Sequence, residues 1–270
     1  MKTIAGGIMM QELKYVKGFA FERDKKQKYS CKPAAISKFA GSRVVLNFDG
    51  KGSQVLDFLD GFQVIVDGEG PWDYEALPVS PKICLITVHM LAKETPKYLA
   101  YIVDEKTGIV TRLENFITTV EKGSTPLSDT ANLVVREFSF GCMENRDCVE
   151  RHHFTADLNG WILESSGSPG NVVRYYIHCD TKISYFQHQW PLNGNPVDKD
   201  GVGYGEAAFL KITDSVYLIT FTKHSHGNQP LILWNLDGGN YAANFGGVSR
   251  RLHCPFVVTA GGYLRVLEKI

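Results

Sequence analysis

The sequence predicts an all-β protein built as two antiparallel β-barrels in tandem. Short β-rich runs follow one another along the chain and are separated by Gly, Asp or Pro. This regular spacing is typical of an antiparallel meander. The second half of the chain also repeats landmarks of the first half in the same order, and such a repeat indicates one structural plan used twice. Helical patterns are scarce, and the best helical candidate is residues 3–15.

The first copy contains six runs that we expect to form strands. They are 42–48, 53–58, 62–66, 82–90, 97–103 and 108–113. The clearest hairpin joins the last two runs, because Gly108 suits the positive φ that follows such a turn. In residues 83–90 both alternating faces are apolar, which predicts a strand covered on both sides.

The second copy contains seven runs, and one of them has a polar face. The runs are 161–165, 172–179, 182–189, 206–211, 215–223, 230–236 and 241–245. In residues 173–179 one face carries Arg174, Tyr176 and His178. Strands with a polar and aromatic face suit a small closed barrel that holds a ligand, and closure removes the sheet edges that would aggregate.

The repeat divides the chain into two domains. Four landmarks of the first copy have counterparts in the second at offsets that grow from 119 to 133 residues: Gly41 with Gly160, Glu75 with Glu206, Leu85 with Leu218, and Asp104 with Asp237. The growing offset places about 12 extra residues in the second copy, mainly between Gln187 and Gly205. We expect a first domain at residues 1–128 and a second, holding the site, at 129–270, with residues 118–132 as the linker.

Composition excludes several classes of partner. Of the 270 residues, 44% are hydrophobic, and 29 Lys and Arg balance 29 Asp and Glu, so no net charge attracts a nucleic acid or a membrane surface. No apolar run reaches the roughly 18 residues of a spanning helix, and residues 1–11 make a poor signal peptide. The six cysteines lack CxxC pairs, which favours a reducing, cytoplasmic setting in which most of them act as unpaired, small buried apolar groups. The alternative is that Cys142 and Cys148 pair and close a short loop.

Several phrases of the chain resemble the MoaF family. Phe39-Ala40-Gly41, Leu46-Asn47-Phe48-Asp49-Gly50 and Tyr74-Glu75-Ala76 are similar to its first domain, and His153–Gly160, Tyr175-Tyr176-Ile177 and Ile212–Leu218 are similar to its second. The resemblance covers roughly residues 35–250 and implies two lipocalin-like (calycin) barrels in tandem. The family's label, molybdenum cofactor biosynthesis protein F, names no activity that we adopt. This chain departs from the family pattern at 174–178, 184–186 and 221–223, so no specific substrate is carried over.

The densest group of titratable and aromatic residues lies on the second-domain hairpin. The catalytic candidates are His178, Tyr176, Tyr185 and His188, with His89 and Glu206 next; the candidates for substrate binding are Arg174, Trp190, Tyr204 and Trp234. An imidazole, phenols and a guanidinium on one wall of a barrel suit proton transfer and the binding of an enolate or carboxylate. The alternative is that these side chains face solvent on an amphipathic sheet, where such residues are common.

Metal and cofactor signals are absent or incomplete. His224-Ser-His226 offers two imidazoles, but no third ligand follows at a useful spacing, so we expect no metal. The segment 201–205, Gly-Val-Gly-Tyr-Gly, is predicted to be a flexible turn at the barrel mouth and not a phosphate loop, because no helix opens after it. We expect no other cofactor.

Three hypotheses about function follow from these features. The first is a cofactor-independent lyase, isomerase or cyclase that acts on a small organic molecule, such as a secondary metabolite, by His, Tyr or Glu acid–base chemistry. The second is a non-catalytic, lipocalin-like carrier of a small molecule, because a fold does not determine function. The third is a pair of barrels that serves as a scaffold. Under all three hypotheses we expect neither a nucleic acid nor a membrane as partner. The sequence leaves open whether the protein forms a homo-oligomer.

Overall fold

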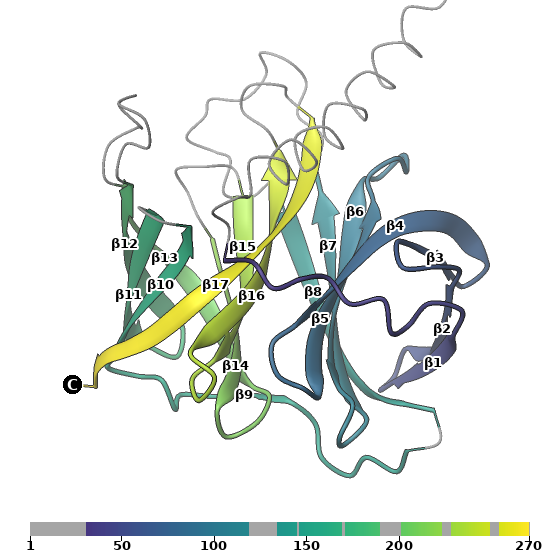
Figure 1. Ribbon diagram of the computed structural model, residues 1–270, viewed down its shortest axis with the longest axis horizontal. Coiled ribbons are helices and arrows are strands. Elements are labelled where there is room, and N and C mark those ends of the chain that lie inside the picture. The colour runs from purple at the N-terminus through teal and green to yellow at the C-terminus, as the bar shows by residue number, and fades with distance from the viewer. Residues whose placement is uncertain are drawn as a thin grey trace, which may run out of the picture.

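The computed structural model describes residues 31–118, 134–144, 146–168, 171–189, 201–222, 228–248 and 254–269. All regular secondary structure in these residues is β-strand, and the strands form two closed antiparallel barrels side by side (Figure 1). The predicted fold class, two tandem antiparallel lipocalin-like barrels, is confirmed. The helical candidate at residues 3–15 lies outside the described residues, and no helix within them is long and apolar enough to span a membrane.

The first barrel closes through eight strands in sequence order. They are β1 (Arg43–Phe48), β2 (Gly52–Phe58), β3 (Gln63–Val66), β4 (Glu69–Pro78), β5 (Ile83–Met90), β6 (Lys97–Asp104), β7 (Ile109–Ile117) and β8 (Val134–Met143). Strand β8 pairs with both β7 and β1 and so completes the barrel. The first barrel therefore extends past the boundary predicted between residues 128 and 129, and the chain leaves it at Met143.

The second barrel repeats this plan. Its strands are β10 (Trp161–Ser168), β11 (Asn171–Cys179), β12 (Lys182–Gln189), β13 (Gly201–Lys211), β14 (Val216–Phe221), β15 (Asn228–Asn235), β16 (Asn240–Val248) and β17 (Pro255–Lys269). The pairing of β12 with β13 closes this barrel, and the short strand β9 (His153–Phe154) adds to the edge of β13. The eight strands of the second barrel, β10 to β17, therefore correspond in order to β1 to β8 of the first, so that β1 is equivalent to β10 and β8 to β17.

Every predicted run lies on an observed strand, but β4, β8, β9 and β17 were not predicted. Glycine and proline explain two of these omissions, because they mark turns in sequence but also occur inside strands where backbones approach closely. Strand β4 begins with Glu69-Gly70-Pro71, and β17 contains Gly261-Gly262. A Cβ on Gly262 would lie 2.1 Å from the carbonyl oxygen of Ser166 in β10, so a side chain there would separate the two strands.

The glycine-rich segment 201–205 is also a strand, which corrects the prediction of a flexible turn. It forms the first half of β13 and pairs with β12. Its glycines allow close packing: a Cβ on Gly205 would lie 2.3 Å from the carbonyl oxygen of Thr222, and one on Gly203 would lie 2.2 Å from the Tyr185 hydroxyl. The extra residues of the second copy lie next to this segment, because 190–200 connect β12 to β13 where only 67–68 connect β3 to β4.

The ladder registers test the landmarks of the repeat. Gly41 and Gly160 are equivalent, since both have positive φ (72° and 77°) and both N–H groups donate to a carbonyl at the end of the second strand. Leu77 lies opposite Leu85, and Leu210 lies opposite Leu218, which fixes an offset of 133 for these strands.

This register makes two of the proposed equivalences wrong. The counterpart of Glu75 is Ala208, two residues beyond Glu206. The counterpart of Asp104 is Asn235, because Ile102 and Leu233 lie opposite the equivalent leucines. Asp104 accepts a hydrogen bond from the Lys106 N–H, and Asn235 accepts one from the Gly238 N–H, so each holds the same turn.

The two barrels share an apolar interface. The outward faces of strands from both barrels form one buried cluster, and its members include Leu77, Ile83, Leu85, Ala100, Ile102 and Leu113 from the first barrel with Leu210, Leu218, Leu231, Leu233 and Ala242 from the second. This explains why both faces of β5 are apolar: Cys84, Ile86, Val88 and Met90 face the first barrel's core, while Ile83 and Leu85 face the second barrel. The prediction of a strand covered on both sides is confirmed.

Hydrogen bonds also link the two barrels across this interface. Asn235 and Asn240 both donate to the carbonyl oxygen of Val79, at 2.8 and 3.0 Å, and Asn244 donates to the Thr87 hydroxyl at 3.2 Å. The described chain also begins on the second barrel, where the Cys31 N–H donates to the Gly167 carbonyl, before it runs to the first barrel. In Figure 1 this first segment crosses in front of β17.

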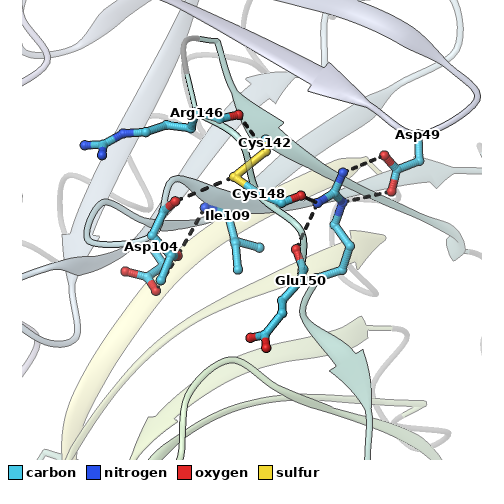
Figure 2. The surroundings of a disulfide bond; sticks show 9 residues. Asp49, Asp104, Ile109, Cys142, Arg146, Cys148 and Glu150 are labelled. Carbon is cyan, nitrogen blue, oxygen red and sulfur yellow. Dashed lines mark hydrogen bonds and ion pairs between the residues drawn. A yellow bond between two sulfur atoms is a disulfide. The ribbon is translucent and has the colours of Figure 1, made fainter.

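A disulfide lies where the chain leaves the first barrel. Cys142, at the end of β8, is bonded to Cys148, and Arg151 beyond it holds Asp49 with two hydrogen bonds of 2.9 Å (Figure 2). This corrects the expectation that the cysteines act as unpaired, small apolar groups. Among the described residues Cys84 keeps that role, and burial raises the pKa of its thiol to about 12.

We predict that Cys148→Ser lowers the free energy of unfolding by about 2 kcal/mol. Opening the short 142–148 loop restores entropy to the unfolded chain, and a loop of this length accounts for roughly that amount. Urea unfolding of the oxidised protein measures the loss. Cys179→Ser is the control, because Cys179 is not in a disulfide, and it should leave the midpoint unchanged; equal losses in both variants would contradict the prediction.

Candidate functional site

The predicted titratable wall lies on the outer face of the second barrel. On β11, Tyr175 and Ile177 are buried in the core, whereas His178 is exposed and Arg174 and Tyr176 are half-buried. Strand alternation puts these two sets on opposite faces. Of the two possibilities left open by the sequence, the hypothesis that Arg174, Tyr176 and His178 line the interior is therefore wrong, and the alternative that they lie on the solvated face is confirmed. The physical reason is that Val173, Tyr175 and Ile177 bury more apolar area when they face inward.

The outward residues are engaged with one another. The Glu164 carboxylate accepts hydrogen bonds from Arg174 at 2.9 Å and from Arg265 at 2.8 Å, and these contacts hold the pKa of Glu164 below its usual value although burial opposes them. The His178 Nε2 lies 2.7 Å from the Ser184 hydroxyl on β12. These contacts link neighbouring strands, as cross-strand pairs on a solvated face commonly do.

The other predicted residues do not form one site. Glu206 is exposed and Tyr204 is 80% exposed, both on β13. His89 is half-buried on the face of β5 opposite the first barrel's core. The backbone of His188 pairs with Val172 in the β11–β12 ladder, but its side chain lies outside the described part of the structure, as do Trp190 and the His224-Ser-His226 pair. Within the described residues no group of metal-ligating side chains comes together.

Two predicted residues, Tyr185 and Trp234, do meet inside the second barrel. Tyr175 lies between Trp234 and Phe221, with ring centroids 5.1 and 6.2 Å away, and the Tyr185 ring lies 5.5 Å from Phe221. We call Tyr175, Tyr185, Phe221 and Trp234 the ring cluster. Edge-to-face contacts at these distances are the preferred arrangement of aromatic pairs.

The ring cluster offers hydrogen-bond donors but no base. The Trp234 side chain is fully buried, and its Nε1–H has no hydrogen-bond partner among the described residues. The Ser165 hydroxyl lies 3.4 Å from the Tyr175 hydroxyl. Burial raises the pKa of Tyr175 to about 12, so this phenol stays protonated at neutral pH.

The buried acids and bases of the described chain lie elsewhere. Asp104 holds the β6–β7 turn, Glu164 binds two arginines outside the second barrel, and His152 lies on the connector between the barrels. Sequence reasoning did not select His152, because a vicinal His-His pair gives no sign of which ring is buried. The structure shows its Nδ1 2.8 Å from the Thr111 hydroxyl on β7.

We predict that protonation of His152 destabilises the fold. Burial lowers its pKa from 6.5 to about 4, so the folded state keeps the neutral ring while the unfolded state binds a proton below about pH 6.5. Stability is then full above pH 6.5 and falls as pH drops toward 4, by roughly 3 kcal/mol in total. Urea midpoints across this range measure the loss. The loss should shrink in His152→Gln and persist in the exposed-site control His178→Gln; an unchanged pH profile in His152→Gln would refute the assignment.

A second polar centre, also missed from sequence, lies inside the first barrel. Arg112 on β7 is only 8% exposed, and its Nη1 and Nη2 donate to Gln54 at 3.1 Å and Ser139 at 3.2 Å. The signal available in the sequence was a single arginine within the apolar run 108–113, where an unpaired charge would not be tolerated.

One surface pocket lies outside both barrels. It has a volume of about 350 Å³ and borders the Cys142–Cys148 disulfide, Asp49 and Arg151. Its main charged groups satisfy each other, because Arg151 donates to Asp49 and to the carbonyls of Cys148 and Glu150.

Fold and interior together define a class, the tandem β-barrel proteins of lipocalin-like architecture, whose barrels are compatible with holding small molecules. No protein-family model matches the chain, and no curated protein matches it.

Proposed function

We propose that this protein is a non-catalytic binder of a small, largely apolar molecule, held in the second barrel. The observation that carries the proposal is the ring cluster with its buried Trp234 N–H, which lacks a partner in the described chain. Ligand sites are typically apolar and aromatic, with a few polar groups that orient the ligand. A ligand with an aromatic or aliphatic body and one acceptor oxygen matches this interior.

Binding is better supported than the lyase, isomerase or cyclase hypothesis. Acid–base catalysis needs a group that accepts a proton near neutral pH. Tyr175 is a poor acceptor because its raised pKa keeps the phenol protonated. The imidazole of His178 lies on the outer face, and the buried carboxylates of the described residues lie outside this interior.

We also propose that the chain is related to the MoaF family, on the phrases that resemble both of its domains. Two lipocalin-like barrels in tandem are what that resemblance implies, and the observed topology agrees with it. The proposed partner is a small-molecule ligand, without nucleic acid or membrane. Nothing in this proposal depends on the family's label.

The proposal is tested by titrating the full chain with 1-aminoanthracene, a neutral fluorophore that brightens in apolar surroundings. Wild type should bind it saturably, at one site in the second barrel. Gly203→Val should weaken binding at least tenfold, because its side chain enters the space of the Tyr185 phenol. Gly203→Ala, a smaller intrusion, should have an intermediate effect.

Two variants serve as matched controls. Val202 is 71% exposed on the opposite face of the same strand, so Val202→Leu should bind like wild type. His178→Ala should also bind like wild type, since His178 is outside the barrel. Loss of binding in His178→Ala, or unchanged binding in a folded Gly203→Val, would reject the second barrel as the site.

A further inference from the structure

The first barrel contains a buried arginine, Arg112, whose guanidinium makes no direct hydrogen bond to a carboxylate of the described residues. The Arg112 side chain shares the inward face of β7 with Val110, and its guanidinium carbon lies 4.5 Å from the centre of the Phe48 ring. Burying a charge is costly unless it is paired and hydrogen-bonded. Whether the cost of burying Arg112 is offset therefore depends on the charge and the number of its hydrogen-bond partners.

The hydrogen-bond partners of Arg112 are neutral. The Gln54 Oε1 that accepts from Arg112 also accepts from the Tyr101 hydroxyl at 2.8 Å, and the second acceptor is the Ser139 hydroxyl. Burial raises the pKa of Tyr101, so this phenol remains a donor. Gln54 is itself oriented by Asp67, which accepts from its Nε2 at 2.9 Å. Donors thus converge on Gln54, and no carboxylate hydrogen-bonds directly to Arg112 within the described residues.

The nearest carboxylate is shared between two cations. The Glu114 carboxylate lies 3.9 Å from Arg112, beyond hydrogen-bond distance, and is in direct contact with the Lys97 ammonium. The Asp67 carboxylate, which accepts from Gln54, is a second negative charge near Arg112, so Arg112 and Lys97 are accompanied by two carboxylates, and neither of these hydrogen-bonds to the guanidinium. An anion bound at Arg112 would supply the direct contact that they do not make.

Arg112 also has an unused donor. Its Nε–H is buried and has no hydrogen-bond partner among the described residues. A guanidinium has five N–H donors in a fork that matches a carboxylate. The Phe48 ring lies against this guanidinium, and the core of the same barrel also contains Leu56, Leu99 and Val110.

We propose that the first barrel binds a small organic acid, with its carboxylate on Arg112 and its apolar body against the inner wall. This site is separate from the ring cluster in the second barrel, so either proposal can fail without the other. It gives the two copies of the repeat different ligand chemistry: an anionic head group in the first barrel and a largely apolar ligand in the second.

Calorimetric titration of the full chain with acetate, benzoate and octanoate tests the proposal, with octan-1-ol as the uncharged match for octanoate. At least one carboxylate should bind at a site that requires Arg112, whereas any binding of octan-1-ol, whose form also suits the second barrel, should not depend on Arg112. Arg112→Met should weaken carboxylate binding at least tenfold. Glu114→Gln removes the competing carboxylate and should strengthen it several-fold.

The controls separate a ligand site from a structural brace. Arg43→Met, an arginine of the same barrel whose side chain is 65% exposed, should not change binding. If Arg112→Met fails to fold by circular dichroism, Arg112→Lys keeps the charge but loses the fork and should still weaken binding. The proposal is overturned if none of the three acids binds wild type at millimolar concentration. The proposal is also overturned if Arg112→Met weakens octan-1-ol binding as much as octanoate binding, or if folded Arg112→Met keeps wild-type affinity for the carboxylates.

Discussion

Replacing Leu233 by aspartate is expected to cost about 3–5 kcal/mol and to uncouple the two barrels, because it places an unpaired charge where no water reaches. Leu233 is fully buried in the interface cluster, which also contains Leu85 and Ile102 of the first barrel. Since this cluster contains residues from both barrels, wild type should unfold in one cooperative transition. Leu233→Asp should unfold in two, with the second barrel melting first.

Calorimetry and intrinsic fluorescence of the full chain measure the number of transitions. Leu59→Asp is the matched control, because Leu59 is 49% exposed and a surface change of this kind costs within about 0.5 kcal/mol. A single transition in Leu233→Asp with an unchanged midpoint would show that the interface does not couple the barrels.

The second large effect is expected from Trp234→Ala, which should destabilise the protein by about 3–5 kcal/mol. Trp234 is among the largest fully buried side chains, and its ring contacts Tyr175 across the barrel. Its removal takes away apolar burial and leaves a cavity that the surrounding barrel cannot fill completely. Urea unfolding followed by circular dichroism measures the loss.

Indole provides the control for this prediction. A cavity shaped like the lost side chain should bind indole, and a ligand that binds only the folded state raises its stability. Indole should therefore raise the melting temperature of Trp234→Ala and leave that of Trp161→Ala, near the start of β10, unchanged. A loss below about 1 kcal/mol, or no response to indole, would mean that Trp234 is not the centre of this core.

Sequence patterns predicted the strands well, because alternation and turn residues are local. They could not say which face of β11 is inside. Tyr175 and Tyr176 are adjacent and chemically identical, and only closure of the barrel decides that Tyr175 is buried while Tyr176 lies outside. The prediction placed the face with titratable side chains inside the barrel, whereas the folded chain places the more apolar face there because this buries more apolar area.

Long-range pairing explains what else was missed. Arg112 is satisfied in part by Gln54, 58 residues earlier, and no spacing rule connects two such positions. Strand β17 pairs with both β10 and β16. Its two glycines are typical of a turn in sequence, but in the fold Gly262 allows the Ser166 carbonyl of β10 to approach the backbone closely. Tyr185 was predicted on the same wall as Tyr176 and His178, and Trp234 was a separate candidate; the structure buries Tyr185 and Trp234 in the second barrel's core, whereas His178 is exposed.

The segment that begins at Cys31 joins the second barrel before the chain builds the first. Lys32 contacts Glu75 of β4, and the Thr259 hydroxyl of β17 contacts the same carboxylate. A substitution of Glu75 would therefore remove a contact to the segment at Lys32 and a contact to β17 of the second barrel together. Exchange of either barrel for a related one would therefore also require this segment to be replaced, because Glu75 of the first barrel is held by Lys32 and by Thr259 of the second barrel.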